Sequence, residues 1–276
     1  MQRMVAIAGL MLSAAGCVSS ACASQLFGVG FDQPTALYSI DQSTGALTAL
    51  GPTGFANVAD LTSDPLTNTL YGVDANGNQL LKMDTKTGQA TRAAILDSVS
   101  PIGSIAFDPV SRQLYGNTVV GFGGATHDTL YRIDPVSGHT TLIGALGSFV
   151  QVFALGFDQH GTLFGISNQS NELIRIDTAT GQGTLIPGAP PLPFQGSFDI
   201  ASRPEDNTMF LANSLNASLY ILDTTTASLT LAGPYGSQTN IVGLAFLSSV
   251  PEPFAVDVLV AGLVILLIAR RCVRMF

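Results

Sequence analysis

Cysteine and tryptophan are nearly missing from this sequence of 276 residues. It has no tryptophan and three cysteines, Cys17, Cys22 and Cys272, all of them close to an end of the chain. Residues 24–250 therefore contain no cysteine. A disulfide framework, a zinc site built from thiolates and a cysteine nucleophile are all excluded from this long central part.

Charge is also scarce, because Asp, Glu, Lys and Arg make up only 11% of the chain. Residues 24–250 contain seven basic residues against 17 acidic ones. Nucleic-acid binding needs clustered lysine and arginine, so we expect no nucleic-acid partner. Glycine, in contrast, is abundant, with 29 residues. Low charge and many glycines are typical of a turn-rich all-β protein.

The three histidines give no recognisable site. His127 lies in a glycine-rich insertion, His139 and His160 lie in turns, and no two have the spacing of a metal-binding pair. The sequence also has no Gly-x-Ser-x-Gly nucleophile motif. We therefore expect no cofactor and no metal, and we predict that the protein is not an enzyme.

The sequence does contain an internal repeat of about 45 residues. Each copy is a short alternating apolar segment that ends in Asp, followed four residues later by Gly, which Ala227 replaces in the last copy. Such an Asp opens a turn by bonding its own backbone, and the glycine takes the positive φ that a tight hairpin requires. Calcium binding is the competing interpretation, but calcium needs six to eight oxygens at one point, whereas these carboxylates lie one per repeat. The repeated aspartates are Asp41, Asp84, Asp134, Asp177 and Asp223.

A second pair of predicted strands precedes the Asp motif, as in residues 105–109 followed by 113–116. Four strands per repeat predict a β-propeller blade. Residues 25–28 match a second strand that has no first strand before it, and the missing strand recurs at 241–246. We therefore predict an all-β propeller of about five four-stranded blades over 24–249, closed by a C-terminal strand. A β-solenoid would need shorter and more uniform repeats.

The Tyr-x-Ile-Asp-x-x-Thr-Gly form of the repeat resembles the broad class of NHL-like and quinoprotein-like propellers. Aligned on the repeat, Asp60 and Asp199 share a first-strand position with Ser104, Ala154 and Gly243. First strands line the central channel of a propeller, so two carboxylates there could hold a cation or a polar ligand. They belong to blades two and five, which are not neighbours, and we expect solvated channel residues instead.

The N-terminus has the pattern of a secretory signal peptide over residues 1–23. An apolar core precedes Ala21 and Ala23, the small residues of an A-x-A site, so we predict cleavage by signal peptidase after Ala23. A second interpretation takes Cys17 as the lipidated residue of a lipobox, although Ala14 stands where leucine is usual. Both interpretations predict export across the inner membrane.

Near the C-terminus, residues 254–269 form an apolar run that would span about 24 Å as a helix. A bilayer core is about 30 Å thick, and Asp257 shortens the uncharged part further. We therefore predict a short transmembrane helix. The basic tail 270–274 favours a cytoplasmic C-terminus.

The order of motifs over 250–276 resembles the PEP-CTERM sorting signal of Gram-negative bacteria. In that family an exosortase, an integral-membrane enzyme, recognises and processes the tail, and the proteins tend to accompany exopolysaccharide and biofilm matrix. Asp257 inside the helix and the weakly basic end depart from the usual pattern. An ordinary anchor that is never cut is the alternative. The resemblance rests on Val250, Pro251, Glu252, Pro253, Arg270 and Arg271.

Two classes of function follow. The first is a non-catalytic protein of the cell envelope, outer surface or secreted matrix, with the propeller as a binding or scaffold surface. Its expected partners are signal peptidase, an exosortase, the inner membrane, and exopolysaccharide or other matrix components. The second class is an exported propeller hydrolase, lactonase-like or glycan-processing, with carboxylates at the channel. Only Asp60, Asp199 and Ser104 place polar side chains at the first-strand position, which favours the first class.

Overall fold

The structure, a computed structural model, describes residues 23–31, 34–121, 127–194, 196, 198–236 and 239–248. Apart from Ala23, these residues belong to one compact unit, Ser24–Ser249. The predicted sorting signal, and the predicted signal peptide except for Ala23, lie outside the described residues. Among the residues that are described, no helix is long and apolar enough to cross a membrane.

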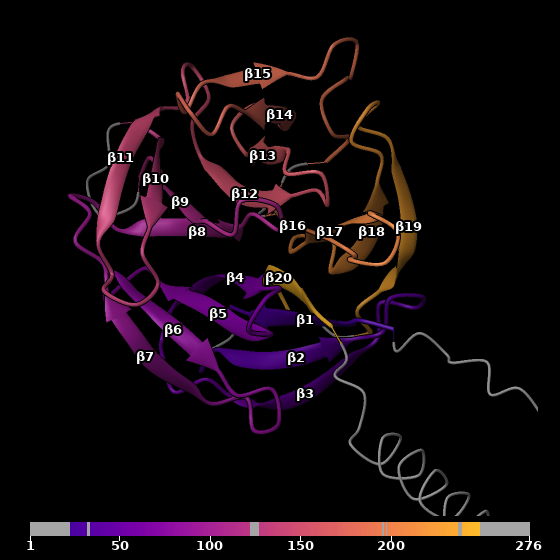
Figure 1. The fold of residues 1–276 in the computed structure, drawn as a ribbon. Helices are drawn as coiled ribbons and strands as arrows, with labels where there is room; N and C mark the ends of the chain where they lie inside the picture. The colour runs from indigo at the N-terminus through magenta and orange to yellow at the C-terminus, as the bar shows by residue number, and fades with distance from the viewer. Residues whose placement is uncertain are drawn as a thin grey trace, which may run out of the picture. The chain divides into compact units, whose positions relative to one another are not determined.

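The described residues contain twenty strands in five antiparallel sheets of four strands each, arranged as blades around a central axis (Figure 1). The predicted five-bladed propeller is therefore confirmed. We name the blades A to E and give their strands from the axis outward. Blade A contains β20 (Ile241–Leu247), β1 (Gln25–Gly30), β2 (Ala36–Ile40) and β3 (Leu47–Pro52), and blade B contains β4 (Val58–Asp64), β5 (Thr69–Asp74), β6 (Gln79–Met83) and β7 (Ala90–Ile95). Blade C contains β8 (Ile102–Phe107), β9 (Leu114–Thr118), β10 (Thr129–Ile133) and β11 (Thr140–Ala145); blade D contains β12 (Val152–Phe157), β13 (Leu163–Ser167), β14 (Glu172–Ile176) and β15 (Gly183–Leu185); and blade E contains β16 (Phe198–Ser202), β17 (Met209–Asn213), β18 (Ser218–Leu222) and β19 (Leu229–Pro234).

The two ends of the propeller meet in blade A, as the sequence predicts. Strand β20 pairs with β1 in antiparallel register, with Leu26 opposite Phe246 and Gly28 opposite Leu244. Its neighbours among the inner strands are β4 and β16, which closes the ring. Closure removes the unpaired inner edge that would otherwise invite aggregation. A β-solenoid, the alternative architecture, is thereby excluded.

The hydrophobic core consists of five separate clusters, one at each junction between neighbouring blades. Between blades A and B, for example, Leu37 and Val29 pack with Leu61 and Leu81. Between E and A, Phe210 and Phe246 meet with ring centroids 5.5 Å apart. Neighbouring blades cover both faces of each sheet, and the strands therefore contain nearly continuous apolar segments. These occur in addition to the alternation that a half-buried strand shows.

The repeated aspartates open the outer hairpin turn of every blade, so the turn interpretation is confirmed. Asp134 Oδ1 accepts the Val136 amide at 2.9 Å, and the Gly138 amide donates to the Asp134 carbonyl at 2.8 Å. Gly138 has φ +78°. Ala227, which replaces the glycine in blade E, adopts the same left-handed conformation at φ +55°. The corresponding Oδ1 atoms of Asp41, Asp84, Asp177 and Asp223 also accept the amide two residues on.

The glycine of this turn has a second role in packing the blades. A Cβ added to Gly88 in blade B would lie 2.4 Å from the Gly51 carbonyl oxygen in blade A. The same clash would occur between Gly181 in blade D and Gly144 in blade C, at 2.5 Å. In blades B and D the turn thus lies against the outer strand of the preceding blade, at a distance that only glycine permits.

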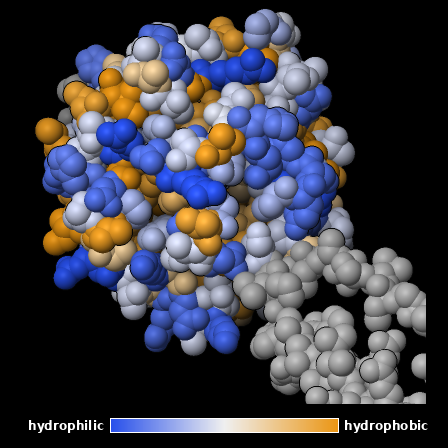
Figure 2. Space-filling view, in the orientation of Figure 1, coloured by the Kyte–Doolittle hydropathy of each residue, from blue (hydrophilic) through white to orange (hydrophobic). Residues whose placement is uncertain are grey.

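The visible surface mixes hydrophilic and hydrophobic residues without one continuous apolar patch (Figure 2). Large apolar side chains that are exposed include Val99, Val136 and Leu215, which lie in different blades or connections. Single exposed apolar residues are common on soluble proteins and indicate no docking site by themselves.

Candidate functional site

One position of the inner strand recurs in all five blades, and we call its five residues the axial ring. Each pairs with the same position of the second strand: Asp60 with Val73, Ser104 with Asn117, Ala154 with Ile166, Asp199 with Ala212 and Gly243 with Val29. The predicted alignment of these residues is therefore confirmed. In blades A to D a register shift directly precedes the ring residue, and such bulges re-aim the side chain that follows.

Asp60 is hydrogen-bonded on both carboxyl oxygens although it is completely buried. Its Oδ2 accepts the Ser104 hydroxyl at 2.6 Å and the Ile105 amide at 2.7 Å, both from the inner strand of blade C. Its Oδ1 accepts the Leu61 amide at 2.6 Å. The carboxyl group of blade B therefore links two neighbouring inner strands at the axis.

Asp199 has the same relation to blade A, with one difference. Its Oδ2 accepts the Leu244 amide, as Asp60 accepts that of Ile105. Where Asp60 finds the Ser104 hydroxyl, Asp199 finds Gly243, which has no side chain. Asp199 forms a side-chain hydrogen bond with Asp60 instead.

Gly243 makes this contact between blades B and E possible. Both blades flank blade A, so their inner strands lie on either side of β20. A Cβ added to Gly243 would lie 2.9 Å from Asp60 Cα and 2.8 Å from the Leu61 nitrogen. The absence of a side chain lets the two carboxyl groups meet across the closing strand, even though their blades are not neighbours in the ring.

Two carboxylates in contact in a completely buried place would repel each other if both were ionised, which favours a proton between them. Burial raises the pKa of Asp60 to about 7, although hydrogen bonds from Asp199 and Ser104 act in the opposite direction. Burial, and then the charge of Asp60, raises the pKa of Asp199 well above its usual range. Among the described residues, no N–H or O–H group donates to Asp199 Oδ1 with ordinary hydrogen-bond geometry. A proton on that oxygen, donated to Asp60, accounts for the geometry.

The expectation that Asp60, Ser104 and Asp199 are solvated channel residues is wrong, because all three are 0% exposed. They do belong together, however, in one hydrogen-bonded cluster. The three side chains lie in the contacts between inner strands, where none of their surface is exposed.

Tyr235 is a further buried polar residue, and its hydroxyl interacts with Asp199. It lies in the connection from β19 to β20, is 2% exposed, and packs in the cluster between blades E and A. Burial and the charge of Asp199 raise the pKa of its hydroxyl. No hydrogen-bond partner for this hydroxyl occurs among the described residues. Sequence reasoning does not find Tyr235, because it stands outside the repeat.

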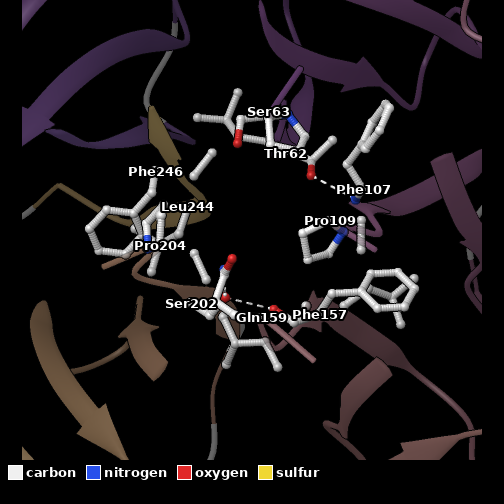
Figure 3. A pocket seen from close by; sticks show the side chains of 18 of the residues that line it. Thr62, Ser63, Phe107, Pro109, Phe157, Gln159, Ser202, Pro204, Leu244 and Phe246 are labelled. Carbon is white, nitrogen blue, oxygen red and sulfur yellow. Dashed lines mark hydrogen bonds between the residues drawn. The ribbon is translucent and has the colours of Figure 1, made fainter. Parts of the chain in front are cut away.

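An open pocket lies at one mouth of the axis, beyond the axial ring (Figure 3). Its volume is about 90 Å³, and all five inner strands line it. The residues three positions after the axial ring are Ser63, Phe107, Phe157, Ser202 and Phe246, and Figure 3 shows them around the opening. Pro65, Pro109 and Pro204 follow them at the rim.

The polar groups of the pocket hold one another in place. The Thr62 hydroxyl accepts the Phe107 amide at 2.9 Å. Gln159 donates to the Ser202 hydroxyl at 2.6 Å, and that hydroxyl donates to the Phe157 carbonyl at 2.8 Å. Among the described residues, every side chain that lines the pocket is uncharged. The position three residues after the axial ring recurs in the sequence repeat, but only the structure shows that the residues at this position line an opening.

His139 and His160 do not belong to the axial ring or to the pocket. His139 pairs with Asp97 at 2.8 Å on the exposed rim, and His160 lies in an inner hairpin turn where its amide donates to Asp158. Within the described ranges, no three His, Cys, Asp or Glu side chains converge on a metal position. Ala23, of the predicted cleavage site, is exposed and lies two residues before β1. Ala21 and the predicted sorting residues Val250, Pro251, Glu252, Pro253, Arg270 and Arg271 lie outside the described residues.

Comparison with known proteins supports the fold and leaves the activity open. No curated protein matches the chain. A chain from the crystal structure of a nidogen/laminin complex superimposes with a TM-score of 0.54 at 12% identity, covering 81% of this chain and 98% of that one. A structural genomics protein of unknown function from Bacteroides thetaiotaomicron gives a TM-score of 0.46 at 16% identity, covering 76% of this chain and 50% of that one. Residues 28–198, more than half of the chain, match the family described as "Repeat of unknown function (DUF6923)", and the protein belongs to this family.

Proposed function

We propose that the protein is exported and non-catalytic, and that its propeller is a binding or scaffold surface in the cell envelope or extracellular matrix. The observation that carries this proposal is the axial pocket, to which every blade contributes and in which every lining side chain is neutral. Hydrolysis of a lactone or a glycosidic bond needs a general acid or base, a nucleophile or a metal in reach of the substrate. The two carboxyl groups nearest the axis are fully buried and bonded to each other.

The size of the pocket favours a large partner over a small ligand. At about 90 Å³ it is small beside the roughly 300–1,000 Å³ of typical small-molecule sites. Phe107, Phe157 and Phe246 line it with their rings turned toward the clusters between blades, and hydroxyl and amide groups complete the lining. Such a mouth suits one protruding group of a polymer, for instance a sugar unit of an exopolysaccharide, with further contacts on the blade rims.

Sorting is the second part of the proposal. The tail that begins at Val250 resembles the PEP-CTERM signal, so an exosortase recognises Pro251, Glu252 and Pro253 and processes the chain after export. The closing strand β20 ends at Leu247, before this motif. Removal of the tail leaves all twenty strands in the released part.

Binding and catalysis are separated by one experiment on the exported protein. Co-sedimentation with exopolysaccharide from the producing cells is measured for the wild type, for Ser63→Tyr, which fills the pocket, and for Ser63→Ala as the matched control. We expect binding by the wild type and Ser63→Ala and a loss of at least tenfold for Ser63→Tyr. Release of new reducing ends, or opening of a lactone panel, would instead support the hydrolase.

Sorting is tested in the producing cells. The protein is followed by mass in cells with and without the exosortase gene, and as the double variant Pro251→Ala/Glu252→Ala. We expect the shortened form to disappear in both cases. A shortened form that persists in both would leave an ordinary anchor, or an unrelated protease, as the explanation.

A further inference from the structure

Ser24 lies directly before the first strand, and hydrogen bonds fix both its backbone and its side chain. It is 3% exposed although it lies outside any strand. Its amide nitrogen donates to Glu205 Oε1 at 2.5 Å, and its hydroxyl donates to Glu205 Oε2 at 2.8 Å. Both oxygens of one carboxylate are thus engaged by a single residue 181 positions away in the sequence.

The carbonyl group of Ser24 is bound as well. Gln42 Nε2 donates to it at 2.6 Å, and Arg203 Nη1 donates to the Gln42 side-chain oxygen at 3.0 Å. Gln42 belongs to a turn of blade A, whereas Arg203 and Glu205 belong to a turn of blade E. All three hydrogen-bonding groups of Ser24 are therefore fixed at the junction where the ring closes.

We propose that Ser24 is the first residue of the mature protein and that Glu205 is the receptor for its α-ammonium group. The proposal rests on the export that we propose above, with cleavage after Ala23. Signal peptidase hydrolyses the bond between Ala23 and Ser24, so that water supplies the new carboxylate oxygen of Ala23 and a proton to the Ser24 nitrogen. That nitrogen then takes up a further proton, because α-amino groups ionise near pH 8.

The chemical change strengthens a contact that the fold already contains. Before cleavage a neutral amide with one N–H group faces Glu205; afterwards an ammonium group with three donors and a positive charge does so. Hydrogen bonds between two charged groups are shorter and stronger than those between neutral groups. Processing therefore stabilises the junction between blades A and E, and the same step that frees the protein from its signal peptide stabilises the closed ring.

The receptor is tested on the mature chain, residues 24–276, purified in detergent with either a free or an acetylated Ser24 nitrogen. Acetylation restores the neutral amide of the unprocessed chain. We expect the free amine to raise Tm by about 2–3 °C. Glu205→Gln removes this difference, and Glu172→Gln, at the other glutamate of the described unit, retains it. Equal Tm values for the two wild-type forms, or a difference that survives in Glu205→Gln, would overturn the receptor.

The cleavage position is tested by the mass of the N-terminal peptide of the protein recovered from the producing cells. An N-terminus at Ser24 supports the proposal. Exported protein that begins at a lipidated Cys17, or at any residue other than Ser24, overturns the inference and leaves export intact. Protein that remains in the cytoplasm with its original N-terminus overturns the proposed function as well, and the location of the protein distinguishes the two failures.

Discussion

Two sets of aspartates in this propeller have the same side chain and opposite electrostatics. At the rim, Asp41, Asp84 and Asp134 are exposed, and hydrogen bonds from the turn that each one opens lower its pKa. At the axis, Asp60 and Asp199 also accept backbone amides, yet their pKa values are raised. Asp60 accepts three hydrogen bonds, as Asp41 does, so burial decides the sign of the shift.

The comparison predicts an unusual dependence of stability on pH, which is the largest effect that we expect. A carboxyl group with a raised pKa stabilises the fold fully below its unfolded value of 3.8, and this contribution is lost as the pH rises through the folded value, about 7 for Asp60. The rim aspartates act in the opposite sense and lose their contribution only below pH 3.8. Stability should therefore be greatest near pH 4.

Urea unfolding of the exported protein at pH 4, 5, 6 and 7 measures this profile. We expect the free energy of unfolding to fall by about 1.4 kcal/mol per pH unit for each proton that the axial pair holds. Asp128, whose pKa is also raised by burial, adds to the fall. A free energy of unfolding that rises from pH 4 to pH 7 would show that both axial carboxyl groups are ionised in the folded protein.

Removal of one axial carboxyl group tests the contrast directly. Asp60→Ala leaves the Ile105 amide, the Ser104 hydroxyl and the proton of Asp199 without their acceptor in a buried place. We expect the free energy of unfolding to fall by about 3–5 kcal/mol, as when a buried pair loses one member. Ser104→Ala, which removes one donor and leaves Asp60 bonded to the Ile105 and Leu61 amides, is the control and should cost less. Equal losses would mean that the pair itself contributes little.

Gly243→Ala tests whether the contact between the two carboxyl groups depends on the missing side chain. The added Cβ would clash with the backbone of Asp60 and Leu61 at 2.8–2.9 Å and push blade B away from β20. Overpacking of this kind costs about 1–3 kcal/mol. The pH dependence should also become shallower, because the separated carboxyl groups no longer share a proton. Normal stability with an unchanged pH profile would contradict the spacer role.

The fold could be predicted from the sequence because its signals are local and repeated. The Asp and Gly of each hairpin turn, with the alternation before them, predict four strands per repeat. The unmatched segment 25–28 and the extra strand 241–246 predict the closure. Even so, the first strand of blade C begins at Ile102, three residues before the predicted 105–109 segment. A bulge there hides the start of the strand from a pattern of alternation.

The site could be predicted only in part. Alignment of the repeat places Asp60, Ser104 and Asp199 at one position, but burial at that position depends on the packing of inner strands from different blades. The expectation of solvation therefore fails. Gly243 matters because it has no side chain, which leaves room for the two carboxyl groups to meet. Ser24 and Glu205 meet only because the ring closes. Contacts between residues far apart in the sequence, with no repeat to mark them, leave no local signal.

A rim aspartate should matter much less than an axial one. Asp134→Ala removes the acceptor of the Val136 amide and the Ser137 hydroxyl, both of which water can replace on the exposed turn. We expect Tm to fall by about 2–4 °C. Asp134→Asn, which keeps an acceptor oxygen for the amide, should recover most of this loss. A fall as large as that of Asp60→Ala would remove the distinction between rim and axis.

The smallest change is expected from the substitution that copies the protonated state. In Asp199→Asn the side-chain oxygen still accepts the Leu244 amide, and the NH₂ group still donates to Asp60. At pH 4 we therefore expect the free energy of unfolding to lie within about 0.5 kcal/mol of the wild type. Between pH 5 and pH 7 its slope should be shallower by about 1.4 kcal/mol per pH unit, since one titrating group is gone. The variant should thus become more stable than the wild type at pH 7, whereas an unchanged slope would place the shared proton elsewhere. A near-neutral mutation at a fully buried acid follows only if that acid is already protonated in the native propeller.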